Sequence, residues 1–199
     1  MKISAVIALI AANVAVFVLQ LLSSETMDVL FALWPLQAFG GPSNFHVWQI
    51  VTYSFLHSTQ NVYHLLFNMF GLWMFGTWIE RSEGPRRFLA CYFASVVTAA
   101  VTQLFVPMMF DSPGEPTIGA SGGVFGLILA CAVMFPKSKV AVYFLIPMPT
   151  WLFALLYALI ELFQGVTGTQ SGVAHFAHLG GMVGSALVVT QWRIRRRVR

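Results

Sequence analysis

Residues 116–126 read Pro-Thr-Ile-Gly-Ala-Ser-Gly-Gly-Val-Phe-Gly, and they open an apolar run that predicts a membrane helix. The stretch places one hydroxyl, that of Ser121, among four glycines. A glycine-rich helix start indicates either close packing against a neighbouring helix or a functional site. The pairs Gly119/Gly123 and Gly122/Gly126 have the small-xxx-small spacing that is typical of close packing in membranes. Packing alone gives no role to the hydroxyl, so the rest of the chain decides between these two interpretations.

The composition of the 199-residue chain indicates a protein that folds in a lipid bilayer. It is 58% hydrophobic and only 9% charged, with a mean hydropathy of +0.77, whereas a soluble domain of this length carries far more charge. Six apolar runs are long enough to cross a membrane: residues 3–22, 62–80, 88–106, 119–135, 141–164 and 173–192. We therefore predict that residues 1–199 form one all-α membrane domain, a compact bundle of six transmembrane helices with a long first outer loop. The aromatic and apolar content of that loop, residues 23–61, predicts short helices lying in the membrane interface.

The basic residues predict the orientation of this bundle. With six crossings, all of them fall on the same side of the membrane: Lys2, Arg81, Arg86, Arg87, Lys137, Lys139, Arg193, Arg195, Arg196, Arg197 and Arg199. The positive-inside rule makes that side cytoplasmic, so both termini are expected in the cytoplasm. The basic C-terminal segment is typical of contact with anionic lipid and not with nucleic acid. A short chain without an organelle-targeting sequence predicts a prokaryotic plasma membrane.

Two other features of the sequence bear on this interpretation. Lys2 before an apolar run also fits a cleaved signal peptide, but the run is longer than a typical signal core and its removal would reverse the charge pattern. Cys91 and Cys131 lie inside apolar runs without the spacing of metal ligands, so we expect no metal and no cofactor.

Polar side chains occur at similar predicted depth in three of the runs. His64 and Asn68 share one face of the second predicted span, and His178 lies near the outer end of the sixth, as Ser121 does in the fourth. Polar groups inside a membrane are costly, which makes these four residues candidates for a functional site. A serine next to a histidine is a nucleophile and base pair for acyl transfer. The predicted oxyanion donors are the Ser121 amide, His64 and Asn68.

A third, acidic member commonly orients the histidine of such a pair. Glu161 is the only weak candidate, and its position near the outer end of a span favours a side chain that reaches for the membrane interface. We therefore predict a Ser121–His178 dyad whose imidazole is held by packing on Phe125, one turn below Ser121. His175, one turn nearer the outside, is expected to face water or the interface.

Three motifs, in this order along the chain, resemble those of the rhomboid intramembrane serine proteases: His64-Leu65-Leu66-Phe67-Asn68, Gly119-Ala120-Ser121-Gly122 and Ala177-His178-Leu179-Gly180-Gly181. The resemblance covers essentially the whole chain, including the long first outer loop. It implies metal-independent cleavage of single-span membrane proteins near the outer ends of their helices, with His64 and Asn68 as oxyanion donors. It also implies a lateral substrate gate made of the fifth span and the loop over the nucleophile. The residues expected to support the site are Gly119, Ala120, Gly122, Phe125 and Gly181.

The sequence departs from the family pattern at three positions. Trp48-Gln49 stands where the family often has Trp-Arg, so a loop anchor through that arginine is absent. Phe125 stands where a tyrosine is common, and Ser185 replaces the second glycine of the stripe in the sixth span. None of these departures touches the predicted dyad.

Two other classes of function stay open at this point. A transporter would use the polar face of the second span as a path, but the chain has no visible inverted repeat and no series of carboxylates. A non-catalytic chaperone or adaptor of the same fold would be natural if the serine or the histidine were lost, and both are present. The sequence makes no prediction of the oligomeric state.

Overall fold

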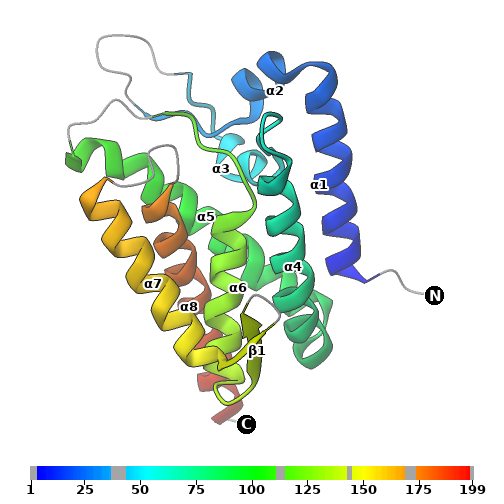
Figure 1. The fold of residues 1–199 in the computed structure, drawn as a ribbon, viewed down its shortest axis with the longest axis vertical. Coiled ribbons are helices and arrows are strands. Elements are labelled where there is room, and N and C mark those ends of the chain that lie inside the picture. Colours follow the sequence, from blue (N-terminus) through cyan, green and yellow to red (C-terminus); the bar gives the residue numbers. More distant parts are fainter. Residues whose placement is uncertain (1–3, 37–43, 111–114, 143–144, 169–173, 198–199) are drawn as a thin grey trace.

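The computed structural model describes residues 4–36, 44–110, 115–142, 145–168 and 174–197, which form a bundle of helices with one small hairpin (Figure 1). The elements are α1 (Ala5–Leu22), α2 (Ser24–Phe31), α3 (Gln49–Thr52), the 3-10 helix η1 (Tyr53–Phe55), α4 (Val62–Glu83), α5 (Pro85–Phe110), α6 (Ser121–Met134), β1 (Lys139–Val142), β2 (Ile146–Pro149), α7 (Thr150–Thr167) and α8 (His175–Arg197).

Helix α6 is the centre of the bundle. It packs against α4, α5, α7 and α8, and ten of its fourteen residues are buried. Fourteen residues make a helix of about 21 Å, shorter than the roughly 30 Å hydrocarbon core of a bilayer. Its first residue therefore lies deep in the bundle, and Figure 1 shows an extended segment running down to it from the level of α2.

The helices differ in whether their length and hydropathy suffice to cross a membrane. One helix accounts for most of each predicted span. Among the residues that the structure describes, only α1, α5 (within Pro85–Phe105) and α7 are both long enough and apolar enough to cross a membrane. Helices α4 and α8 have 22 and 23 residues but carry polar and basic side chains, and α6 is a shorter apolar helix. Large apolar side chains are nevertheless exposed on the outer faces of the bundle, which suits a lipid environment: Leu19, Phe67, Trp73, Leu159, Phe163 and Leu187.

The predicted start of the fifth span, residues 141–164, is wrong, because α7 begins only at Thr150. The prediction of an all-α fold also needs one amendment, because two short strands precede this helix. Strands β1 and β2 form an antiparallel hairpin, in which Lys139 pairs with Pro149 and Val142 with Ile146. Helix α7 begins only at Thr150, because the residue before a proline avoids the helical conformation and a proline inside a helix lacks the N–H that the ladder requires. The prolines at 147 and 149 therefore delay the helix.

The predicted first outer loop contains, among its described residues, the short helices α2, α3 and η1, and it has an anchor of its own. Gln49 is fully buried in it. Its Oε1 accepts hydrogen bonds from the backbone of His46 at 3.1 Å and of Trp34 at 3.4 Å, and its Nε2 donates to the carbonyls of Asn44 at 3.2 Å and Leu30 at 3.3 Å. A single buried glutamine thus ties this loop together.

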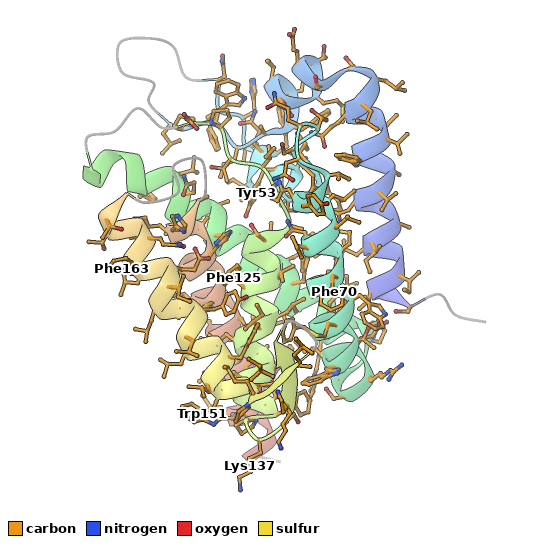
Figure 2. The ribbon with its side chains drawn as sticks, in the orientation of Figure 1. Tyr53, Phe70, Phe125, Lys137, Trp151 and Phe163 are labelled. Carbon is orange, nitrogen blue, oxygen red and sulfur yellow. The ribbon has the colours of Figure 1, made fainter. Side chains whose placement is uncertain are left out.

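The loop also braces the segment that leads into α6. Leu33 and Thr117 exchange two backbone hydrogen bonds of 2.9 Å. Tyr53 accepts the Gly119 N–H on its carbonyl at 3.0 Å and donates its hydroxyl to the Val96 carbonyl of α5 at 2.9 Å. Figure 2 shows Tyr53 above the start of α6. These bonds hold the backbone that precedes Ser121 between the outer loop and α5.

Candidate active site

Ser121 is the first residue of α6, nearer the helix end than the sequence indicates. The turn before it needs a glycine, because Gly119 has a φ of +123° and a Cβ there would lie 2.7 Å from His64 Nε2. The first turn of a helix has N–H groups without partners inside the helix, and the positive end of the helix dipole lies there. The Ser121 hydroxyl is thus in a place that favours developing negative charge.

The Ser121 hydroxyl and the His178 ring meet across the contact between α6 and α8. Ser121 Oγ lies 2.8 Å from His178 Nε2, a normal hydrogen-bond distance. The two helices approach closely because both contribute glycine: a Cβ on Gly181 would lie 2.0 Å from the carbonyl oxygen of Gly122. His178 is only 7% exposed.

Phe125 lies against the imidazole of His178. The rings of Phe125 and His178 stack with centroids 4.3 Å apart and planes 5° from parallel. Figure 2 shows Phe125 on the side of α6 that faces α7 and α8. Tyr157 of α7 also contacts the phenyl ring in a tilted arrangement, with centroids 6.0 Å apart. Packing therefore limits the rotation of the His178 ring.

His64 in the first turn of α4 contributes a second imidazole. The backbone N–H of Ser58 donates to its Nδ1 at 3.3 Å, so the neutral ring carries its proton on Nε2, the atom that lies against Gly119. Asn68, one turn further along α4, is buried and donates one amide hydrogen to the His64 carbonyl at 2.8 Å. The second hydrogen of that amide is not used in this bond.

The expectation for Glu161 and His175 is wrong. Both side chains are buried, at 7% and 5% exposure, and neither reaches the membrane interface. Glu161 Oε2 lies 2.7 Å from His175 Nδ1 and 2.9 Å from His178 Nδ1. The imidazole of His178 is therefore held by a carboxylate as well as by packing. A signal was present in the sequence, since His175 and His178 are three residues apart on one helix face and Glu161 interrupts an apolar run.

The family model of the rhomboid domain matches residues 44–194, three quarters of the chain. This range includes every residue of the candidate site named in the preceding paragraphs. The chain belongs to the rhomboid family. It is 30% identical over 161 residues to the mitochondrial RHOMBOID-like protein 12 of Arabidopsis thaliana, 31% over 144 residues to the mitochondrial Rhomboid protein 1 of Saccharomyces cerevisiae, and 30% over 155 residues to the Rhomboid protease GluP of Bacillus subtilis. These alignments include 74%, 71% and 75% of this chain, but only 46%, 40% and 28% of the three relatives. The chain thus spans less than half the length of each of these three relatives.

The imidazole of His57, which lies between η1 and α4, is also buried next to the site. His57 and His64 have ring centroids 5.1 Å apart. Burial, with His64 as a neighbour, lowers the pKa of His57 to about 4, so this ring is neutral at pH 7. A neutral His57 leaves no positive charge beside His64.

Among the described residues of this rhomboid, one group of side chains has the spacing of a metal site. The ligand atoms of Glu161, His175 and His178 lie within 4.8 Å of one another. The distances from Glu161 Oε2 to Nδ1 of His175 and to Nδ1 of His178 are those of N–H···O hydrogen bonds. Two imidazole N–H groups therefore satisfy the carboxylate without a metal.

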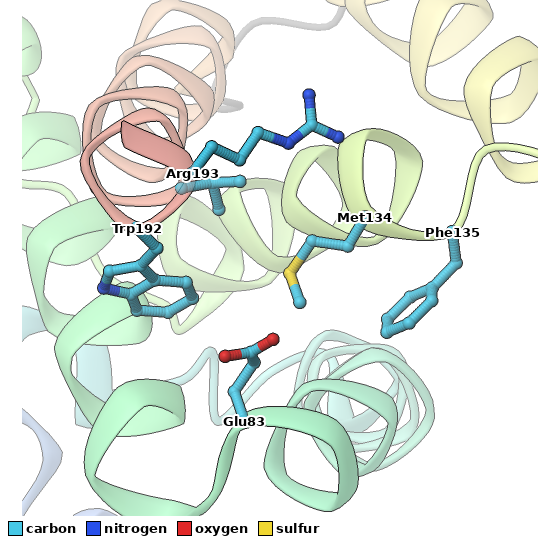
Figure 3. A pocket seen from close by; sticks show the side chains of 6 residues that line it. Glu83, Met134, Phe135, Trp192 and Arg193 are labelled. Atoms are coloured by element: carbon cyan, nitrogen blue, oxygen red, sulfur yellow. The ribbon is translucent and has the colours of Figure 1, made fainter. Parts of the chain in front are cut away.

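A separate pocket lies at the opposite ends of the same helices. Its volume is about 210 Å³, and the residues that line it are Glu83, Met134, Phe135, Val189, Trp192 and Arg193 (Figure 3). It contains none of the predicted site residues, because His64, Ser121 and His178 stand in the first turns of α4, α6 and α8 and the pocket lies at the last turns.

Proposed function

We propose that this rhomboid is an intramembrane serine endopeptidase that cleaves transmembrane segments of single-span membrane proteins near the outer membrane face. The observation that carries the proposal is the 2.8 Å contact between Ser121 Oγ and His178 Nε2. Membership in the rhomboid family and the similarity to a relative named as a protease support the same conclusion.

In the first half of the reaction, Ser121 Oγ attacks the scissile carbonyl while His178 Nε2 accepts the hydroxyl proton. The oxyanion of the tetrahedral intermediate receives hydrogen bonds from the Ser121 N–H, from His64 Nε2–H and from the free amide hydrogen of Asn68. His178 then gives its proton to the leaving amine as the C–N bond breaks, and an acyl ester remains on Ser121.

In the second half, a water molecule attacks this ester while His178 Nε2 accepts the water proton. The second tetrahedral intermediate collapses with the proton returned to Ser121 Oγ, which releases the carboxylic acid product. Helix N-termini at α4, α6 and α8 add partial positive charge around both oxyanions. The chemistry uses only side chains and backbone, so the activity is expected to resist EDTA.

The proposal includes six membrane crossings with both termini in the cytoplasm and the site open toward the outside. It is supported by the described basic side chains, since Arg81, Lys137 and Arg193 lie at or beyond the last turns of α4, α6 and α8, away from Ser121. Figure 2 shows Lys137 at the end of the bundle opposite Tyr53. The proposed membrane is a prokaryotic plasma membrane, and reporter fusions to the two termini test the orientation.

The experiment is cleavage of a single-span reporter by detergent-solubilised protein in EDTA, comparing wild type with Ser121→Ala, His178→Ala and the matched control Ser82→Ala. Ser82 is exposed near the cytoplasmic end of α4. We expect the wild type and the control to cleave, and a fluorophosphonate to label Ser121. Equal cleavage by all four proteins would identify a contaminant. No cleavage and no labelling in any of them, with the reporter still bound, would favour the non-catalytic adaptor.

A further inference from the structure

We propose that Glu161 is a positioning residue that converts the Ser121–His178 pair into a Ser–His–Glu triad, with His175 holding the carboxylate in place. This inference rests on the proposed function, because it assigns a role within the same site. The observation behind it is that a single oxygen, Glu161 Oε2, lies at hydrogen-bond distance from Nδ1 of both histidines.

Glu161 is a buried acid within an apolar helix. The residue lies in α7, one of the helices long and apolar enough to cross a membrane, and it is 7% exposed. A carboxylate in such a place costs several kcal/mol unless hydrogen bonds or opposite charges compensate for the lost water. A carboxylate only accepts hydrogen bonds, and two imidazole N–H groups are the donors that it needs. The cluster is thus complete when both histidines carry a proton on Nδ1.

The tautomer of His178 follows from this arrangement. With its Nδ1–H donated to Glu161, the neutral ring keeps its lone pair on Nε2, the atom that lies 2.8 Å from Ser121 Oγ. That is the tautomer that a general base requires. When Nε2 takes the serine proton, the positive charge of the imidazolium forms 2.9 Å from the carboxylate. Glu161 therefore acts on the reaction through His178 and does not touch the reacting atoms.

His175 gives the Glu161 carboxylate a second hydrogen-bond donor besides His178. It stands three residues before His178 on the same face of α8, and its Nδ1–H reaches the same oxygen from a second direction at 2.7 Å. Two donors on one oxygen prevent the Glu161 side chain from turning away from His178. The acid comes from α7 and both histidines from α8, and Gly165 of α7 allows the close approach, since a Cβ there would lie 3.0 Å from the Phe176 ring.

The competing interpretation is a metal site made of the same three ligand atoms. A metal bound at Nδ1 would replace its proton and leave the neutral ring protonated on Nε2, which then lacks the lone pair that accepts the serine proton. Such an ion would block the base. The titratable groups that face His178 are Glu161 from α7, His175 from its own helix and His64 from α4, and none of them except Glu161 is an acid.

The test is Glu161→Gln, which keeps the length of the side chain and an oxygen that accepts both N–H groups but removes the negative charge. Glu25→Gln, an exposed position in α2, is the matched control. With the single-span reporter in EDTA, we expect Glu161→Gln to lower kcat at least tenfold and to slow fluorophosphonate labelling of Ser121 by a similar factor. KM and the melting temperature should stay close to those of the wild type, and the control should be unchanged in all four measurements.

Four outcomes would overturn the inference. If Glu161→Gln melts earlier but retains the kcat of the wild type, the residue only connects α7 to α8. If Zn²⁺ restores an activity that EDTA removes from the wild type, the three side chains form a metal site. If wild type is inert and Ser121 is not labelled, the proposed function fails and the triad fails with it. Active wild type beside an equally active and stable Glu161→Gln would reject the triad alone.

Discussion

Replacing Gly181 with alanine tests whether the approach of α6 and α8 builds the site. A Cβ at this position would lie 2.0 Å from the carbonyl oxygen of Gly122 and 2.8 Å from its carbonyl carbon. These are backbone atoms, so no side-chain rotation relieves the overlap. A carbon approaches a carbonyl oxygen to about 3.3 Å, and the two helices must therefore separate by about 1 Å.

The separation acts directly on the reacting atoms. Gly181 is three residues from His178, and Gly122 is adjacent to Ser121, so the 2.8 Å contact between Ser121 Oγ and His178 Nε2 should lengthen by a similar amount. A distance near 3.8 Å is no longer a hydrogen bond. We expect a loss of about 100-fold in kcat/KM, together with about 1–3 kcal/mol of stability.

The assay is cleavage of the single-span reporter by Gly181→Ala, with melting temperature measured in the same detergent. Gly76→Ala, three turns beyond His64 in α4, is the control, because its Cβ would meet only side-chain atoms, Phe88 Cε2 at 2.9 Å and Val6 Cγ2 at 3.1 Å, which can shift without moving α6 or α8. The control should retain most of the activity. A Gly181→Ala protein with the activity and melting temperature of the wild type would refute the reasoning, since it would mean that the helices are not in contact there.

Three further predictions concern stability. Gln49→Ala removes the hydrogen bonds that this fully buried side chain makes to backbone groups of the loop and should cost about 2–3 kcal/mol, seen as a lower melting temperature; an unchanged melting temperature would contradict its role as anchor. Burial lowers the pKa of His57 from the ordinary 6.5 to about 4, so as the pH falls the unfolded chain takes up a proton before the folded chain does. The folded protein should therefore lose about 3 kcal/mol of its free energy of unfolding as the pH falls from 6.5 toward 4, and none of it above pH 6.5. Melting curves between pH 4 and 7.5 check this, and His57→Asn should flatten the dependence; equal slopes for both proteins would exclude His57 as the cause. Glu80 accepts hydrogen bonds from Ser4 Oγ at 2.5 Å and from the first amides of α1 at 2.7 and 3.1 Å, so Glu80→Ala should speed hydrogen exchange in the first turn of α1, and unaltered exchange would argue against this cap.

The sequence by itself determined the class of fold and the residues worth testing. Long apolar runs with few charges require a bilayer, because only helices or closed barrels satisfy their backbone there. A serine, two histidines and an asparagine in otherwise apolar runs were identifiable as candidates for a site, since each is costly in lipid. The glycines around Ser121 and Gly181 indicated the close helix contact. These are local properties, readable from composition and spacing.

Only the tertiary structure decided how the polar groups are paired. The position of Glu161 in its helix fits equally well a side chain at the interface and one inside the bundle, and the difference depends on which face of α7 meets α8. In the same way, Gln49 becomes an anchor only because distant backbone groups of the loop surround it. Hydrogen bonds between residues 14 or 17 positions apart, as between Glu161 and the two histidines, depend on helix packing and leave no periodic trace in the chain.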